Sequence, residues 1–142
     1  MNPKIIISAV ALLFLSGCMY GYEINTSVTR ISPKPFEQAN KLPEIYFDDN
    51  NLQLAEPYEQ LAFIEVQGTY GSNASQLVAQ LKSEGAKVGA DAIINIRQHY
   101  ISRESGELIS EILNPDVNHS YIYNTISITG IAIKFNYVTN PL

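Results

Sequence analysis

The 142-residue chain has a single cysteine, few basic residues and no long apolar run, and each shortage excludes a class of protein. One cysteine cannot form a disulfide within the chain, so packing alone has to stabilise the fold. Nine Lys and Arg against fourteen Asp and Glu argue against nucleic-acid binding and against electrostatic attachment to anionic lipid. The mostly apolar run Ile5–Leu15 has eleven residues, whereas a membrane-spanning helix needs roughly 20.

The N-terminus has the pattern of an export signal instead. A short segment ending in Lys4 precedes the apolar run, and small residues precede Cys18. Leu15-Ser-Gly-Cys18 resembles the lipobox of bacterial lipoproteins. The resemblance implies cleavage before Cys18, a diacylglycerol on its sulfur and often a further acyl chain on the new amino terminus. The alternative is an ordinary secretory signal followed by a chance cysteine.

Processing at Cys18 determines the expected location. Removal of residues 1–17 leaves 125 residues with a net charge of −6, because Lys4 is lost. Each buried methylene contributes about 0.8 kcal/mol, so two or three acyl chains hold a protein firmly on a membrane. In lipoproteins of enteric-type bacteria, which this N-terminus resembles, an Asp after the cysteine favours inner-membrane retention; here that residue is Met19. We therefore expect an exported, lipid-anchored protein, in the outer rather than the inner membrane.

The mature chain is expected to have two parts. Residues 18–43 are predicted to be the lipidated N-terminus and a tether or arm, and residues 44–142 one compact domain. A flexible chain of about 25 residues would reach roughly 25–30 Å. Apolar side chains leave open that part of the arm lies on the domain: Tyr20, Tyr22, Ile24, Val28 and Ile31.

The first half of the domain has the pattern of strands around one helix. Residues 44–47 and 61–67 are predicted strands, the second with period-two alternation. A helix is predicted from an N-cap at Ser72 or Asn73 to a stop at Gly89. Its apolar stripe consists of Ala74, Leu77, Val78, Leu81, Gly85 and Val88. The next strand is predicted to have Ala92, Ile94 and Ile96 on one face and Ile93, Asn95 and Arg97 on the other.

The second half of the domain reads as strands joined by turns. The strand from residue 92 is predicted to reach a turn at Ser105-Gly106, followed by a hairpin arm over 108–113. After a second turn at 114–116, a β-rich run covers 121–137. Its apolar Ile and Phe residues occupy even-numbered positions before Gly130 and odd-numbered positions after it, which predicts a β-bulge or a bend at this glycine. The fold class is therefore α+β: a mostly antiparallel sheet with one main helix on one face, in the order β-α-β-β-β.

Three segments resemble a known group of bacterial domains. The small α+β domains of the YbjQ-like superfamily are similar to this chain in three segments: the strand at 61–68, the stretch Leu81-Lys-Ser-Glu-Gly-Ala-Lys-Val-Gly-Ala-Asp-Ala-Ile-Ile-Asn-Ile-Arg97, and Gly130-Ile-Ala-Ile-Lys-Phe135. That group includes a proposed heavy-metal-binding family and the sensor lipoprotein of the Rcs envelope-stress phosphorelay. The similarity covers roughly residues 58–98 and 126–137. Two features depart from the group: Gly85 replaces the usual Ala, and the stress sensor's cysteines are missing.

The motif Gly89-Ala90-Asp91-Ala92 has packing explanations of its own. Gly89 permits the left-handed backbone that ends a helix, and small Ala90 and Ala92 let helix and sheet approach. Asp91 is expected to accept hydrogen bonds from nearby turn amides rather than to act in catalysis, since no second titratable group stands beside it in the pattern.

Candidate groups for chemistry follow the helix in the chain. They are His99, Glu104, Glu107, Glu111, Asp116 and His119. Imidazole and carboxylate ligands suit zinc or copper, and His99 and His119 would meet if their strands were neighbours. The two histidines lack metal-motif spacing, so we predict no metal and no cofactor, and keep this pair as the alternative.

Patterns of enzymes are weak in this chain. A Ser-His-Asp hydrolase is disfavoured because no Gly-x-Ser-x-Gly sequence occurs. Gly68-Thr-Tyr-Gly71 lacks the glycine spacing and the lysine of a phosphate-binding loop, so a plain turn is favoured. No catalytic residue is predicted, and an enzyme ranks third among the functions.

Aromatic residues indicate a contact surface. The chain has nine tyrosines, two of them in one β-run at Tyr121 and Tyr123. Phe63, Ile93 and Ile131 are predicted on the sheet face away from the helix, where either the N-terminal arm or a partner covers them. We expect a non-enzymatic, lipid-anchored envelope protein that acts through contacts with an envelope protein or a second copy, in sensing or assembly. The alternative is a metal- or small-ligand-binding envelope lipoprotein.

Overall fold

The computed structural model describes residues 19–47, 57–107 and 120–136. The hairpin arm predicted at 108–113 and the turn predicted at 114–116 lie outside the described residues.

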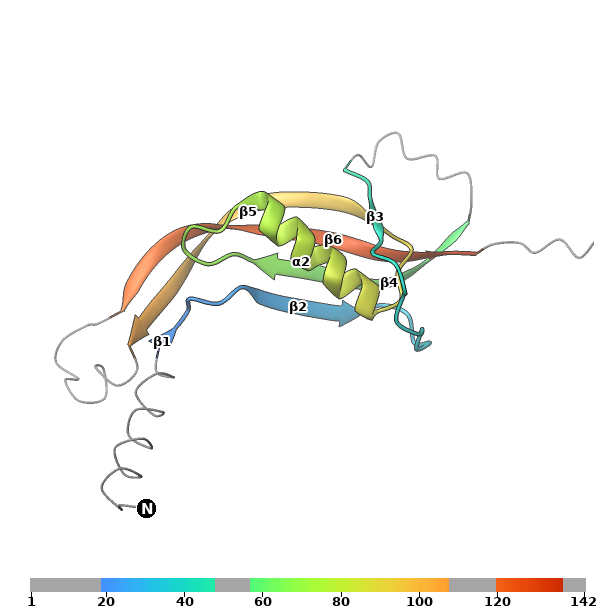
Figure 1. The fold of residues 1–142 in the computed structure, drawn as a ribbon, viewed down its shortest axis with the longest axis horizontal. Coiled ribbons are helices and arrows are strands. Elements are labelled where there is room, and N and C mark those ends of the chain that lie inside the picture. Colours follow the sequence, from blue (N-terminus) through green and yellow to red (C-terminus); the bar gives the residue numbers. More distant parts are fainter. Residues whose placement is uncertain (1–18, 48–56, 108–119, 137–142) are drawn as a thin grey trace, which may run out of the picture.

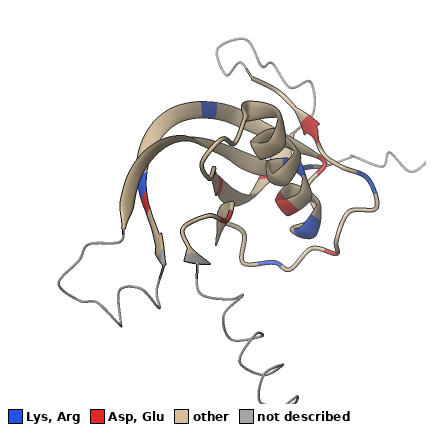
Figure 2. Ribbon diagram, turned by 60° about the vertical axis from the view of Figure 1, so that its left-hand side comes forward, with Lys and Arg blue, Asp and Glu red and all other residues tan. Residues whose placement is uncertain are grey.

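One helix and one sheet make up the described fold. The strands are β1 (Met19–Tyr20), β2 (Asn25–Arg30), β3 (Glu44–Ile45), β4 (Tyr58–Gln67), β5 (Ala92–Glu107) and β6 (Tyr121–Phe135), and the helix is α2 (Ala74–Lys87). The sheet order is β1-β5-β6-β4-β2, with β3 beside β5, and only the β3–β5 pairing is parallel. The helix lies on one face (Figure 1), and the long strands arch over it (Figure 2). The predicted class, α+β with a mostly antiparallel sheet and one helix packed on one face, is confirmed.

Helix α2 begins and ends where its sequence predicts. Asn73 is the N-cap: its Oδ1 accepts from the backbone N–H of Gln76 at 3.0 Å, and Gln76 Oε1 accepts from the N–H of Asn73 at 3.1 Å. This reciprocal pair satisfies two of the amides that have no partner inside the helix. At the other end Gly89 has a φ of +85°, which a residue with a side chain rarely adopts.

The core lies between α2 and the sheet. Leu77 and Leu81, one turn apart on the helix, have no exposed surface. The buried apolar residues that form the core cluster are Leu61, Ala62, Ile64, Val66, Leu77, Leu81, Val88, Ala90, Ile93, Ile128 and Ala132. Ala62, Ile64 and Val66 alternate along the 61–67 strand and form its face under the helix.

The predicted faces of β5 are wrong at Ile93. Ile93 is fully buried under α2, and its Cδ1 would lie 2.8 Å from a Cβ on Gly85. A register shift between Ile94 and Arg97, with Asn95 at a φ of 55°, breaks the period-two alternation. Ile93 and Ile96 consequently point to the same side of the strand.

The β-bulge or bend predicted at Gly130 corresponds to a bulge opposite this residue, in β5. Ile94 pairs with Ile131 and Arg97 with Thr129, so two residues of β5 face Gly130. The register shifts lie in the neighbours, between Gln60 and Ala62 of β4 and within β5, while β6 pairs through Gly130 with Ile64 opposite. A Cβ on Gly130 would come within 2.6 Å of Ile93 Cγ2. The apolar positions of β6 therefore switch at Gly130, where the absence of a side chain leaves room for Ile93 of β5.

The turn predicted at Ser105-Gly106 is wrong because both residues belong to β5. Ser105 pairs with Tyr121 of β6, and Gly106 pairs with Tyr20 of β1. The N-terminal segment packs directly against this part of β5. A Cβ on Gly21 would clash with the carbonyl oxygen of Glu104 and would lie 2.6 Å from Cα of Ser105. Small residues here serve close packing between strands rather than a reversal of the chain.

The N-terminal arm joins the sheet through β1 and β2 and then packs against the end of the helix. All six residues of β2 pair with β4, so the sheet begins before residue 44. The chain then runs past the C-terminal end of α2, where the N–H of Ala39 donates to the carbonyl of Ala86 at 2.9 Å and Pro43 is buried. Of the alternatives that the sequence left open, the packed arm is the one seen from β2 to Pro43.

Candidate functional site

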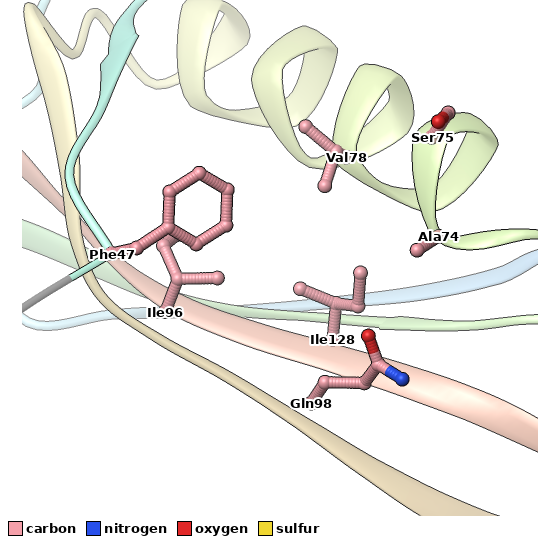
Figure 3. A pocket seen from close by; sticks show the side chains of 7 residues that line it. All are labelled: Phe47, Ala74, Ser75, Val78, Ile96, Gln98 and Ile128. Atoms are coloured by element: carbon pink, nitrogen blue, oxygen red, sulfur yellow. The ribbon is translucent and has the colours of Figure 1, made fainter.

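A groove on the helix side of the sheet is a concave feature of the described surface. It has a volume of about 470 Å³ and is lined by Phe47, Ala74, Ser75, Val78, Ile96, Gln98 and Ile128. Figure 3 shows Val78 and Ala74 on the helix above Ile96, Ile128 and Gln98 on the strands, with Phe47 closing one side. Only Ser75 and Gln98 contribute polar side chains, so the groove suits apolar groups.

The groove exists because α2 does not reach over the whole sheet. The helix begins at Ala74, and its first turn lies above the row formed by Gln98 and Ile128. In the next row Tyr100 is paired with Ile126, and Tyr100 is 79% exposed. Phe47, which follows β3, is 66% exposed. The apolar face of the sheet therefore continues past the end of the helix.

The outer edge of β5 adjoins this groove. On that edge β3 pairs only with Ala92 and Ile93, and β1 pairs only with Gly106 and Glu107. Among the described residues, no strand pairs with the outer edge of β5 over 98–105. Backbone groups along an edge strand are a template for another extended chain. The site thus combines an apolar groove with the strand edge over 98–103, since Gly21 packs against Glu104 and Ser105.

The opposite face of the sheet holds His99 in a polar cluster. His99 is directly opposite Ser127 in the β5–β6 ladder, and its Nε2 lies 4.0 Å from Oε1 of Glu65. The same Oε1 accepts from Ser127 Oγ at 3.0 Å and from Gln67 Nε2 at 3.1 Å. The Ser127 hydroxyl is fully buried and donates to a carboxylate rather than to the imidazole, so the cluster lacks the nucleophile–base pair of a hydrolase.

The described structure does not bring the predicted metal-ligand candidates together. Residues alternate sides along β5, so Glu104 lies on the helix side of the sheet and His99 on the other. Glu111, Asp116 and His119 lie outside the described residues, as does the side chain of Glu107. Within the described ranges, no three His, Cys, Asp or Glu residues are close enough to hold a metal ion.

Asp91 connects the end of the helix motif to the last strand. Its Oδ1 accepts from Lys134 Nζ at 2.8 Å, and its Oδ2 accepts from the backbone N–H of Phe135 at 3.0 Å. Gly89, in turn, lies against the backbone of Glu37 in the N-terminal arm. The motif therefore meets β6 on one side and the arm on the other, which are contacts of a structural element.

Phe63 and Ile131 form the apolar part of the face away from the helix. They are paired across β4 and β6, Ile94 continues the row on β5, and Phe63 remains 40% exposed. The described part of the arm extends the sheet at β2 and then passes the helix, so it does not cover this row.

Sequence reasoning missed the groove. It assigned Val78 to the buried stripe of the helix, whereas the structure leaves it half-buried at the groove. A signal was present in Tyr100, an aromatic residue within the polar part of the strand, which the structure leaves 79% exposed. No sequence pattern showed, however, how far the helix would reach across the sheet.

The chain was compared with models of protein families, with curated proteins and with solved structures, and none of them matches it. Helix α2, at 14 residues, is too short to cross a membrane, and no other described helix is long and apolar enough to do so.

Proposed function

We propose that this protein is a non-enzymatic, lipid-anchored protein of the cell envelope that binds an extended segment of another envelope protein along β5. The observation that carries the proposal is the outer edge of β5 next to an apolar groove. An edge strand supplies main-chain hydrogen bonds, and a neighbouring pocket supplies specificity for a side chain.

The geometry suits an extended chain better than a rounded ligand. β3 already pairs in parallel with the start of β5. At the end of this pairing, the N–H of Tyr46 donates to the carbonyl oxygen of Ile93 at 3.0 Å. An added strand would continue this line past Gln98. A bound Leu or Phe side chain entering the groove would contribute about 1.5–3 kcal/mol.

Attachment to the membrane supports a partner in the envelope. The lipobox-like sequence before Cys18 supplies the anchor, and the net charge of −5 for the whole chain disfavours nucleic acid as the partner. The residue after Cys18 favours the outer membrane over the inner. Self-association along the same edge is the competing outcome of the test below.

Photocrosslinking in cells tests this proposal. A benzophenone amino acid replaces Tyr100 beside the groove, and in a control strain it replaces Tyr58, an exposed tyrosine on β4. We expect one discrete adduct at position 100, linked to an extended segment of an envelope protein, and its loss in a Val78→Glu variant that keeps the wild-type melting temperature. An adduct between two copies of this chain, or equal adducts at both positions, would refute the proposal.

The alternative function, binding of a metal or small ligand through His99 and His119, stays a prediction. The structure shows one carboxylate near His99, that of Glu65, and His119 lies outside the described residues. His99 and Glu65 are two potential ligands, and a protein zinc site has three or four.

A further inference from the structure

The acylated residue joins the sheet without a spacer. Cys18 is bonded to Met19, and Met19 and Tyr20 form β1 against the end of β5. Two further bonds hold the next residues: Tyr123 Oη donates to the carbonyl of Gly21, and Arg103 Nη1 donates to the carbonyl of Glu23 at 2.7 Å. A tether of roughly 25–30 Å, the reach of about 25 flexible residues, is therefore absent from the described chain.

This attachment defines one end of the sheet, which we call the β1 end: β1, the last residues of β5 and the first residues of β6. Figure 1 shows these three segments together, far from β3. Exposed apolar and aromatic side chains gather there. Tyr121 is 66% exposed, Ile122 79% and Tyr70 75%, and Tyr70 packs edge-on against Tyr123 with ring centroids 6.1 Å apart.

Tyrosine is suited to the boundary between lipid and water, because its ring is apolar and its hydroxyl is polar. Five of the nine tyrosines of the chain lie at or beside the β1 end: Tyr20, Tyr22, Tyr70, Tyr121 and Tyr123. An amphipathic helix that lies in this boundary buries its apolar face about 5–10 Å deep, so shallow contacts of apolar side chains are enough for docking. The β1 end therefore has the composition of a lipid-contacting surface at the place where the lipid is attached.

Charge at the β1 end excludes attraction to anionic lipid as the cause of docking. Glu23 and Glu104 are exposed there, whereas the guanidinium of Arg103 is engaged with the carbonyls of Glu23 and Gly68. A contact with this surface has to rest on apolar burial and on tyrosine hydroxyls, and it suits zwitterionic headgroups.

We infer that the domain docks on the lipid surface through its β1 end and stands in a fixed orientation on the membrane. This inference rests on the proposed lipid anchor. Strands rise about 3.3 Å per residue, so the groove at Gln98 is held roughly 20 Å along β5 from Glu104, and Ala92 about 40 Å. The membrane contact thus holds the groove, and the part of the β5 edge beside it, away from the lipid.

Depth-dependent quenching tests the orientation, and the chain suits it because an acylated Cys18 leaves no other thiol. The full-length lipidated protein carries a single new cysteine, Ile122→Cys at the β1 end or Leu42→Cys near β3, labelled with an environment-sensitive dye. Leu42 is a matched control because it is also exposed, at 56%. The proteins are reconstituted in vesicles of phosphatidylcholine and phosphatidylethanolamine that contain spin-labelled lipid.

We expect quenching at position 122 to be several-fold greater than at position 42, and to fall when phosphatidylglycerol is added. Equal quenching at both positions in a protein whose mass shows the thioether-linked lipid would overturn the docked orientation alone. A protein that carries no lipid at Cys18 would instead refute the anchor. Quenching that increases with phosphatidylglycerol would overturn the apolar basis of the contact.

Discussion

Gly85 of α2 packs directly on Ile93 of β5, with no room for a side chain between them. A Cβ on Gly85 would lie 2.8 Å from Ile93 Cδ1 and 3.0 Å from Cγ of Pro43. The resemblance to YbjQ-like domains, which stays a prediction from the sequence, would put Ala at this position. In this chain the small residue lets the helix, β5 and the N-terminal arm meet at one point, because Pro43 belongs to the arm.

Replacing Gly85 with alanine is expected to destabilise the protein despite better helix propensity. The propensity gain is about 1 kcal/mol, whereas overpacking a rigid core costs about 1–3 kcal/mol. We expect a net loss of about 1 kcal/mol in the free energy of unfolding of a 19–142 fragment, measured by denaturant titration. The double variant Gly85→Ala/Ile93→Val removes Cδ1 and should recover part of the loss; independent, additive effects of the two changes would contradict the proposed contact.

Truncation of Leu81 tests the buried face of the helix. Leu81 has no exposed surface and faces the sheet core. Leu81→Ala should lower the free energy of unfolding by about 2–5 kcal/mol through lost burial and a cavity. Ala79, which is exposed on the opposite face, provides the control as Ala79→Ser. An unshifted denaturant midpoint for Leu81→Ala would contradict the burial of this face of the helix against the sheet.

Asp91 should matter more for stability than its ion-pair partner. Removal of its carboxylate in Asp91→Ala takes away both the ion pair and the hydrogen bond that Oδ2 accepts from the backbone N–H of Phe135, and should cost about 1–3 kcal/mol. Lys134→Ala removes only a partly exposed ion pair and should cost less than about 1 kcal/mol. Thermal unfolding of the two variants gives the order, and an equal cost for both would locate the stabilisation in the ion pair instead.

Mutation of Cys18 tests the lipid anchor. Because the chain has no other cysteine, Cys18→Ser should stop processing or yield a protein without thioether-linked lipid. Radiolabelled palmitate incorporation and partitioning into the membrane fraction are the measurements. Cleavage, palmitate labelling and membrane partitioning that persist unchanged in the variant would end the lipoprotein interpretation.

The histidines are expected to be dispensable for fold and location. We predict no micromolar binding of zinc or copper to the protein in equilibrium dialysis, and normal folding and localisation of the double variant His99→Ala/His119→Ala. The physical reason is that His99 has only Glu65 within 4.0 Å among the described acidic side chains. A stoichiometric metal complex that disappears in the double variant would promote the alternative function.

The sequence by itself determined the elements whose causes are local. The capping pair of Asn73 and Gln76, the apolar stripe through Leu77 and Leu81, and the stop at Gly89 act within a few residues of one another, so the predicted helix agrees with the structure. The same holds for the alternation in the 61–67 strand, and these elements together were enough to predict the α+β class.

Tertiary structure alone decided the features that depend on distant residues. The pairing of β2 with β4 joins residues 32 to 42 positions apart in the chain. The bulge in β5 places Ile93 and Ile96 on the same face, under a helix whose Gly85 leaves room for Ile93. The groove depends on how far α2 reaches across the sheet, and the β1 end depends on Gly106 meeting Tyr20. Side-chain periodicity carries no information about which segments meet, because it records only which face of an element is buried.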